Sequence, residues 1–132
     1  MKIVIDTNVL ISGVFFGGAP RRVLDAVIDS KVSAFASPEI VEEYQEIVEE
    51  MISRKQGHMN RNLLDPLLQR VTIILPVKKA AVCRDPDDNK FLDCARDSKA
   101  LYIVSGDKDL LVLEHYENTD IITAKEFCER YL

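Results

Sequence analysis

Two of the uninterrupted hydrophobic runs in the chain predict buried strands. One run spans Ile3 to Ile5 near the start, and the other lies within Leu101 to Ser105. Runs without alternation are typical of central parallel strands that are covered on both faces. Shorter strands are predicted at residues 31–36, 71–75 and 121–122.

Apolar residues at helical spacing separate these strands. An apolar stripe predicts a helix over residues 21–30. The longest predicted helix follows Ser37 and Pro38, which suit an N-cap and a first-turn proline, and it ends near Ser53. Further helices are predicted after Thr7, over residues 62–70, after Asp85 and after Thr123. The polar segment over residues 54–61, which contains His58, is predicted to be a connecting loop.

The composition is that of an ordinary globular protein, with 47% hydrophobic and 30% charged residues in a chain of 132. We therefore expect a single domain over residues 1–132. The longest apolar run is far shorter than the roughly 20 residues of a membrane helix, and no segment resembles a signal peptide, so a cytoplasmic location without membrane contact is expected. The three cysteines lack a C-x-x-C spacing, which argues against zinc and against a disulfide framework.

Two aspartates come shortly after the two hydrophobic runs. Asp6 directly follows the first run and Asp107 follows the second, so both are expected at the carboxyl edge of the sheet. Open α/β sheets bind ligands outside this edge, which favours a chemical role for both acids. Each also has a purely structural alternative, because Asp6 suits a helix cap and Asp107 suits a turn.

Two further acids lie towards the inward side of predicted helices. Glu43 is the glutamate of the long helix that lies nearest to its apolar stripe. Asp88 lies three and four residues before Phe91 and Leu92, which places it on the inward face of its helix. The structural alternatives are a solvated acidic face for Glu43 and a favourable position near a helix N-terminus for Asp88.

Acids gathered at one edge of a sheet would require a cation, because like charges raise one another's pKa. A set of ligands made only of oxygen atoms favours Mg²⁺ or Mn²⁺. Such a site can activate water and stabilise the attacking and leaving oxygens of a phosphodiester. The net charge of −5 argues against a nucleic-acid partner, but metals bound by the acids would supply positive charge locally.

Four segments together form a specific pattern: I-D-T-N-V-L at the amino terminus, then S-P-E-I-V-E-E-Y, D-P-D-D-N-K-F-L-D-C-A and Y-I-V-S-G-D-K-D-L-L. In this order and spacing they resemble a PIN domain of the kind found in VapC-like toxins of toxin–antitoxin systems. The resemblance extends from Lys2 to about Leu132. It implies an α/β protein with three α/β/α layers and a central parallel sheet of four to five strands.

The resemblance also implies an activity, that of a Mg²⁺- or Mn²⁺-dependent endoribonuclease that hydrolyses phosphodiester bonds of single-stranded or structured RNA. The catalytic and metal-binding acids of the family correspond to Asp6, Glu43, Asp88 and Asp107. Related sequences often carry an acid at the position of Asp93, but the helical wheel turns Asp93 away from Asp88. Whether Asp93 or Asp109 joins the four acids stays open at this point.

The implied partners are an RNA substrate, an antitoxin protein and a second copy of the chain in a homodimer. The candidate RNA contacts are Arg21, Arg22, Lys90 and Lys108. The alternative is a catalytically weak PIN-like module that holds RNA or a protein, because retained metal ligands do not prove turnover.

Overall fold

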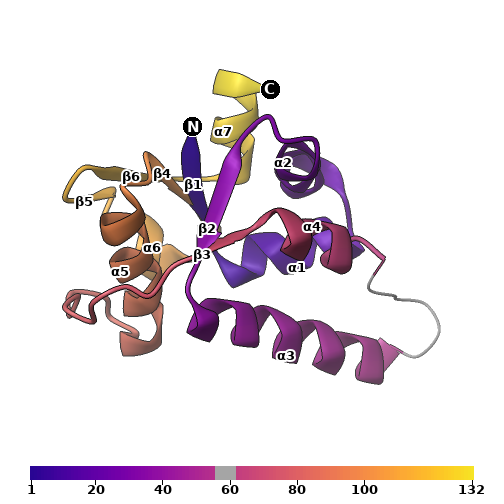
Figure 1. Ribbon diagram of the computed structural model, residues 1–132, viewed down its shortest axis with the longest axis horizontal. Coiled ribbons are helices and arrows are strands. Elements are labelled where there is room, and N and C mark those ends of the chain that lie inside the picture. The colour runs from indigo at the N-terminus through magenta and orange to yellow at the C-terminus, as the bar shows by residue number, and fades with distance from the viewer. Residues whose placement is uncertain (56–61) are drawn as a thin grey trace.

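The computed structural model describes residues 1–55 and 62–132, and within them it shows a six-stranded sheet with helices on both faces (Figure 1). The strands are β1 (Lys2–Ile5), β2 (Ser33–Ala36), β3 (Thr72–Ile73), β4 (Tyr102–Val104), β5 (His115–Tyr116) and β6 (Thr119–Ile122). The helices are α1 (Thr7–Phe15), α2 (Gly18–Ile28), α3 (Pro38–Lys55), α4 (Leu64–Arg70), α5 (Asn89–Ser98), α6 (Lys108–Leu111) and α7 (Ala124–Tyr131), with a 3-10 turn η1 (Pro86–Asp88) before α5.

The sheet has the strand order β3-β2-β1-β4-β6-β5. All neighbouring strands are parallel except β5, which pairs with β6 as an antiparallel hairpin at one edge. The prediction of a central parallel sheet is therefore confirmed. β1 lies between β2 and β4, with Ile5 opposite Val104, so the carboxyl ends of β1 and β4 are adjacent.

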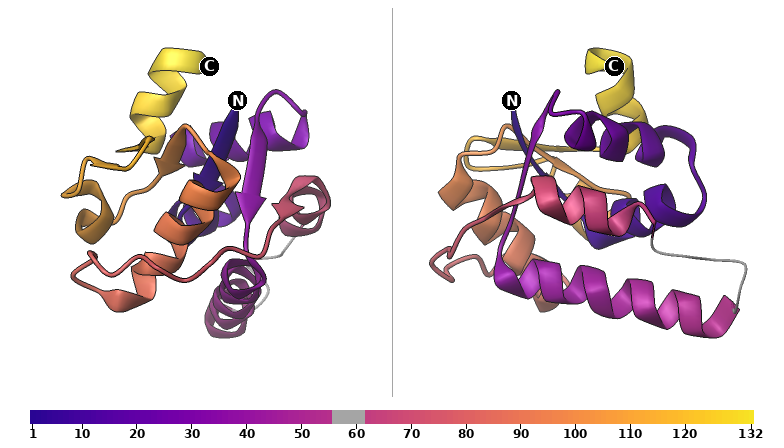
Figure 2. Two further views of the ribbon diagram at one scale, coloured as in Figure 1. Left: turned by 60° about the vertical axis from the view of Figure 1, so that its left-hand side comes forward. Right: turned by 45° about the vertical axis from the view of Figure 1, so that its right-hand side comes forward.

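Helices cover both faces of this sheet. On one face, α5 packs across β1, β2 and β4. On the other face, α2 contacts α1, α4 and α7, and in the left view of Figure 2 α5 lies in front of the strands while α1 and α2 lie behind them. The long helix α3 contacts β2, α1 and α5. The predicted three-layer α/β/α arrangement is confirmed.

The two hydrophobic runs form the middle of the core. Ile3, Val4 and the two residues Ile103 and Val104 are completely buried, as expected for strands covered on both faces. The apolar stripe of α3 also faces inward, and its Tyr44 is buried with its hydroxyl donating a hydrogen bond to the carbonyl oxygen of Ile5. The helix that carries Glu43 is thus attached directly to the end of β1.

Several element boundaries differ from the predicted ones. α2 begins at Gly18 rather than at residue 21, because Gly17 and Gly18 adopt positive φ angles of 94° and 69° that turn the chain sharply into the helix. β3 is shorter than the predicted strand over residues 71–75, and α3 continues to Lys55. The remainder of the predicted loop, residues 56–61 with His58, lies outside the described residues.

The three cysteines, Cys83, Cys94 and Cys128, are all buried free thiols. This agrees with the prediction that they form no disulfide framework. Across residues 1–55 and 62–132, none of the helices has the length and apolar character needed to cross a bilayer.

Candidate active site

Asp6 and Asp107 meet at the adjacent carboxyl ends of β1 and β4. The backbone N–H of Asp6 donates to the carbonyl oxygen of Val104 at 3.0 Å, which continues the parallel ladder by one residue. Ser105 Oγ then donates to Asp6 Oδ2 at 2.8 Å and accepts from the backbone N–H of Asp107 at 2.9 Å. The buried Ser105 hydroxyl therefore fixes both acids at one point of the sheet edge.

Asp107 also has a structural role, that of a helix cap rather than the turn residue given as its alternative. Its Oδ1 accepts a hydrogen bond from the backbone N–H of Asp109 at 2.8 Å, so it caps the short helix α6. This cap turns the chain so that Asp107 and Asp109 both face Asp88. A residue can cap a helix and also contribute an oxygen atom to a site, so the two interpretations of Asp107 are compatible.

Asp88, like Asp6, is a buried acid of the site. The side chain of Asp85 caps η1 by accepting from the backbone N–H of Asp87 at 3.0 Å, and Pro86 begins this turn, so the predicted Asp-Pro start of the helix is confirmed. Asp88 ends η1 and is 7% exposed. Within residues 1–55 and 62–132, its Oδ2 atom is buried without a hydrogen-bond partner.

Three carboxylates converge at this place. Asp88, Asp107 and Asp109 each offer an oxygen atom within 4.8 Å of the others. Asp109 Oδ1 also pairs with Arg84 at 2.8 Å, so one cation outside the cluster already balances part of its charge. The open question about Asp109 is answered in part, because its side chain lies with the predicted acids.

The titration of these acids reflects their crowding. Burial, together with the negative charge of Asp107, raises the pKa of Asp88 from 3.8 to about 7. Burial also raises the pKa of Asp6 to about 6, although the hydrogen bond from Ser105 acts in the opposite direction. Both carboxyls therefore keep their protons to a higher pH than an exposed aspartate does, and a nearby cation would favour their ionised forms.

Glu43 is held beside this cluster by two neighbours. Thr7 Oγ1, from the residue after Asp6, donates a hydrogen bond to Glu43 Oε2. Lys90 Nζ donates to Glu43 Oε1 at 2.9 Å. Glu43 is thus brought towards the same edge of the sheet as predicted, but its carboxylate lies against a lysine rather than in the cluster of Asp88, Asp107 and Asp109.

The basic residues proposed as RNA contacts have different surroundings. Lys90 is buried, and its ammonium group also contacts the carbonyl oxygen of Asp87 at 2.9 Å and the carboxylate of Asp87 at 3.0 Å, which uses its three donors. Arg21 donates to the carbonyl oxygens of Gly13 and Val14 at the end of α1. Both side chains are therefore occupied within the fold, whereas Arg22 and Lys108 are exposed.

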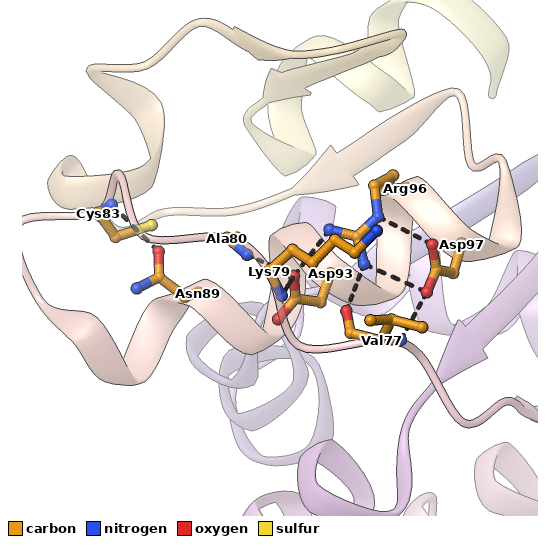
Figure 3. A network of polar contacts seen from close by, with 8 residues as sticks. All are labelled: Val77, Lys79, Ala80, Cys83, Asn89, Asp93, Arg96 and Asp97. Carbon is orange, nitrogen blue, oxygen red and sulfur yellow. Dashed lines mark hydrogen bonds and ion pairs between the residues drawn. The ribbon is translucent and has the colours of Figure 1, made fainter.

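Asp93 faces away from the cluster, as the helical wheel indicates. Its Oδ1 accepts from the backbone N–H groups of Lys79 at 3.1 Å and Ala80 at 2.8 Å, and Arg96 Nη1 contacts it at 2.9 Å. Figure 3 shows these contacts together with those of Asp97, which accepts from the N–H of Val77 at 2.7 Å. Asp93 thus fixes the segment before η1 to helix α5.

Asn89 is a residue of this region that the sequence interpretation did not single out. Its side-chain oxygen accepts from the backbone N–H of Cys83 at 3.1 Å, which ties the chain close to Asp88 (Figure 3). Ser105 was missed in the same way. The available signal was position alone, since Asn89 directly follows Asp88 and Ser105 lies two residues before Asp107.

The donor atoms around Asp88 fit a hard divalent cation. The cluster offers only oxygen atoms, which Mg²⁺ and Mn²⁺ prefer over softer metals. The buried, unpartnered Oδ2 of Asp88 adds an independent indication, because an acceptor left alone in a buried position is costly unless something binds it. Asp88, Asp107 and Asp109, with Asp6 beside them, are therefore suited to hold such a cation.

Comparison with known proteins gives the family. A PIN-domain profile matches residues 2–109, which include all of the acids described above. The chain belongs to the PIN-domain family. A protein of Methanocaldococcus jannaschii that is described as uncharacterized is 35% identical, in an alignment that covers 99% of this chain and 92% of that protein. No solved structure matches the chain.

Membership of the PIN-domain family indicates the general kind of chemistry that the acids can serve. PIN domains are generally nucleases, and they typically use divalent metals. The matched region contains β1, α3, η1, α5 and β4, and it ends at Asp109 within α6. The PIN domain described here therefore combines a nuclease-type family with an oxygen-rich site suited to a metal.

Proposed function

We propose that this PIN domain is a Mg²⁺- or Mn²⁺-dependent endoribonuclease. The observation that carries the proposal is the unpartnered, buried Oδ2 of Asp88, which lies among the carboxylates of Asp107 and Asp109. A structural cluster would satisfy this atom with a hydrogen bond or an arginine, as happens at Asp93. A buried acceptor without such a partner is instead prepared for a cation.

The residues of the chain have separate roles in this proposal. Asp88, Asp107 and Asp109 would hold the cation, and Asp6 would act beside them, directly or through water. A bound Mg²⁺ or Mn²⁺ activates water and neutralises charge on the phosphate oxygens. Glu43, positioned by Thr7 and Lys90, orients the attacking water or accepts its proton.

Cleavage of a labelled single-stranded RNA with Mn²⁺ tests the proposal. The wild-type protein should cut the RNA internally, and Asp107→Asn should reduce the rate by at least about 100-fold, because loss of a ligand charge weakens metal binding and the reaction together. EDTA should abolish cleavage by the wild-type protein.

A matched control variant distinguishes the loss of a site carboxylate from the loss of one negative charge elsewhere on the protein. Asp29 is an exposed residue that directly follows α2, so Asp29→Asn makes the same chemical change away from the acid cluster. It should cleave RNA at the wild-type rate. If the wild-type protein binds Mn²⁺ and RNA but cleaves no RNA tested, the alternative of an RNA-holding PIN module replaces the nuclease proposal.

We also propose that the chain acts as the toxin of a toxin–antitoxin pair. The support is the resemblance to VapC-like toxins, and the test is growth arrest when the chain is expressed alone, relieved by coexpression of a protein encoded beside it. An antitoxin that forms a stable complex with the chain should be recovered with it on copurification. Unimpaired growth during expression of an RNA-cleaving chain would contradict the toxin role.

Self-association is a further proposal. Its support is the exposed apolar row beside the edge strand β3, where Ile73 is 50%, Leu75 84% and Val77 57% exposed. Light scattering should show a dimer for the wild-type protein, and Leu75→Asp should weaken it. A monomeric wild-type protein at high concentration would contradict this proposal.

A further inference from the structure

Two pockets border the acid site, and their linings have opposite character. The first, here called the α1–α7 pocket, has a volume of about 350 Å³ and lies between α1, the start of α2, the end of β4 and the start of α7. The second, here called the α3–α5 pocket, has a volume of about 290 Å³ and lies between α3 and the η1–α5 segment. Both volumes are close to the lower end of the range of small-ligand sites.

The α3–α5 pocket is unsuited to a polyanion. It is lined by Glu39, Glu42, Glu43, Glu46 and Asp87, with Lys90 as its cation. Lys90 is already paired with Glu43 and Asp87. An RNA phosphate that entered here would meet uncompensated carboxylates.

The α1–α7 pocket has the opposite charge and no acidic lining residue among those the structure describes. Lys125 is its charged residue; it is exposed and makes no ion pair within residues 1–55 and 62–132. Asn8 and Ser12 from α1 add polar groups that can donate and accept hydrogen bonds. Val9, Ala19, Pro20 and Ala124 supply an apolar wall.

This pocket is joined to the acid site through two of its own lining residues. Ser105 lines the pocket and donates to Asp6 Oδ2 at 2.8 Å, and Gly106 lies between Ser105 and Asp107. A Cβ atom added at Gly106 would have no other group within 4 Å, so the space beside this residue is open. Ser105 and Gly106 thus place the pocket directly beside the acids.

We propose that the α1–α7 pocket holds one unpaired nucleotide of the RNA substrate next to the phosphate that is cleaved, with Lys125 bound to a neighbouring phosphate. This inference rests on the proposed function and names the path of the substrate. The apolar wall is suited to the face of a base, and the amide of Asn8 and the hydroxyl of Ser12 are suited to its edge or to the ribose. The acidic lining of the α3–α5 pocket directs the strand away from that side.

Binding measurements test this path without relying on cleavage. The probe is a fluorescent single-stranded oligouridine of about 10 nucleotides, mixed with the protein and Ca²⁺, and its anisotropy is followed over a range of salt concentrations. Lys125→Glu should weaken binding about tenfold and reduce the slope of log affinity against log salt by about one, because one phosphate contact is lost. Ser12→Phe, which fills the pocket, should weaken binding without changing the slope.

Lys31→Glu is the matched control, since Lys31 is exposed and lies before β2, away from the carboxyl edge. It carries the same change in net charge and should bind the probe with no more than about a twofold loss. Equal losses for Lys125→Glu and Lys31→Glu would overturn the proposed path. Mn²⁺ titration of the same variants should show unchanged metal affinity.

The same experiment distinguishes this inference from the proposed function. If the wild-type protein cleaves RNA but Lys125→Glu leaves the RNA affinity and the salt slope unchanged, the nucleotide site is contradicted and the nuclease proposal stands. If the wild-type protein binds the probe through Lys125 but does not cleave RNA, the nucleotide site stands and the nuclease proposal is contradicted. Binding of double-stranded RNA in preference to the single strand would also overturn the inference, because a base inside a duplex cannot enter the pocket.

Discussion

Asp88 and Asp93 lie five positions apart along the η1–α5 segment, are both buried, and have opposite surroundings. Asp93 accepts from two backbone N–H groups and contacts Arg96. Asp88 faces other carboxylates, and within residues 1–55 and 62–132 its Oδ2 has no partner. Burial alone therefore does not distinguish these two acids, but the partners of their buried oxygen atoms do.

The difference has a physical origin. A buried carboxylate is tolerated when hydrogen bonds or a cation offset its loss of hydration. The fold supplies both at Asp93. At Asp88 it supplies the like charges of Asp107 and Asp109, which favour either the protonated form of Asp88 or a bound cation. Substitution of each acid in turn can test this comparison.

The largest effect is expected for Asp88→Asn. Loss of the central carboxylate should lower the affinity for Mn²⁺ at least tenfold, about 1.4 kcal/mol, and reduce RNA cleavage at least about 100-fold. Isothermal titration and cleavage of labelled RNA measure the two quantities. The metal-free variant should be no less stable than wild type, because the substitution removes a crowded negative charge. Wild-type Mn²⁺ affinity in this variant would contradict the metal site.

Asp93→Asn should give the reverse pattern. The variant loses the charge that Arg96 and the N–H groups of Lys79 and Ala80 contact, which should lower the free energy of unfolding by about 3 kcal/mol. Urea unfolding measures this loss. Its Mn²⁺ affinity at a temperature where it is folded should equal that of wild type. If the Mn²⁺ affinity of Asp93→Asn fell as far as that of Asp88→Asn, the proposed difference between the two acids would be contradicted.

Lys90→Met tests the contact between Glu43 and the lysine. Methionine retains the buried apolar stem and removes the ammonium group, so Glu43 and Asp87 lose their shared cation. The free energy of unfolding should fall by about 2 kcal/mol, less than for Asp93→Asn, because Glu43 is 24% exposed and keeps some hydration. If Lys90 served RNA alone, stability would be unchanged and only RNA affinity would fall.

The smallest effect is expected from pH. Folding raises the pKa of Asp88 from 3.8 to about 7 and that of Asp6 to about 6, so both acids bind protons more tightly in the folded protein. Without divalent metal, stability should therefore increase as pH falls from about 7 towards 4, and this contribution is lost as pH rises through about 7.

The expected change is about 1 kcal/mol, because water at the open side of the site screens the charges. Thermal unfolding of wild type and Asp88→Asn in EDTA measures it, and the variant should lose most of the pH dependence. Added Mn²⁺ should stabilise wild type more at higher pH, since ionised acids bind metal better. A metal-free wild type whose stability is independent of pH between about 5 and 7 would contradict the raised pKa of Asp88.

The sequence carries enough information for some of these features. A buried β-branched run that ends in an acid places Asp6 at a carboxyl edge, and the helical wheel separates Asp88 from Asp93 because their angular positions differ along one helix. Both deductions use local geometry. The assignment of catalytic roles to Asp6, Glu43, Asp88 and Asp107 stays a prediction until the variants are measured.

Other features depend on contacts between distant segments. Nothing local indicates that β4 pairs beside β1, and this pairing brings Asp107 to Asp6. The buried ion pair of Lys90 arises because α3 and α5 pack together, so a lysine that is a candidate RNA contact in sequence lies inside the fold. Asp109 joins Asp88 through the short turn of α6, which hydrophobic periodicity does not detect.

The buried cysteines have a consequence for spectroscopy. Burial raises the pKa of Cys83 to about 11 and that of Cys94 to about 12, and it also raises the pKa of Cys128. All three therefore remain protonated thiols at neutral pH and react slowly with maleimides. A Lys125→Cys variant would accept a fluorophore or spin label at that one exposed position, with the native thiols left in place, so the distance from the mouth of the pocket to labelled RNA becomes directly measurable.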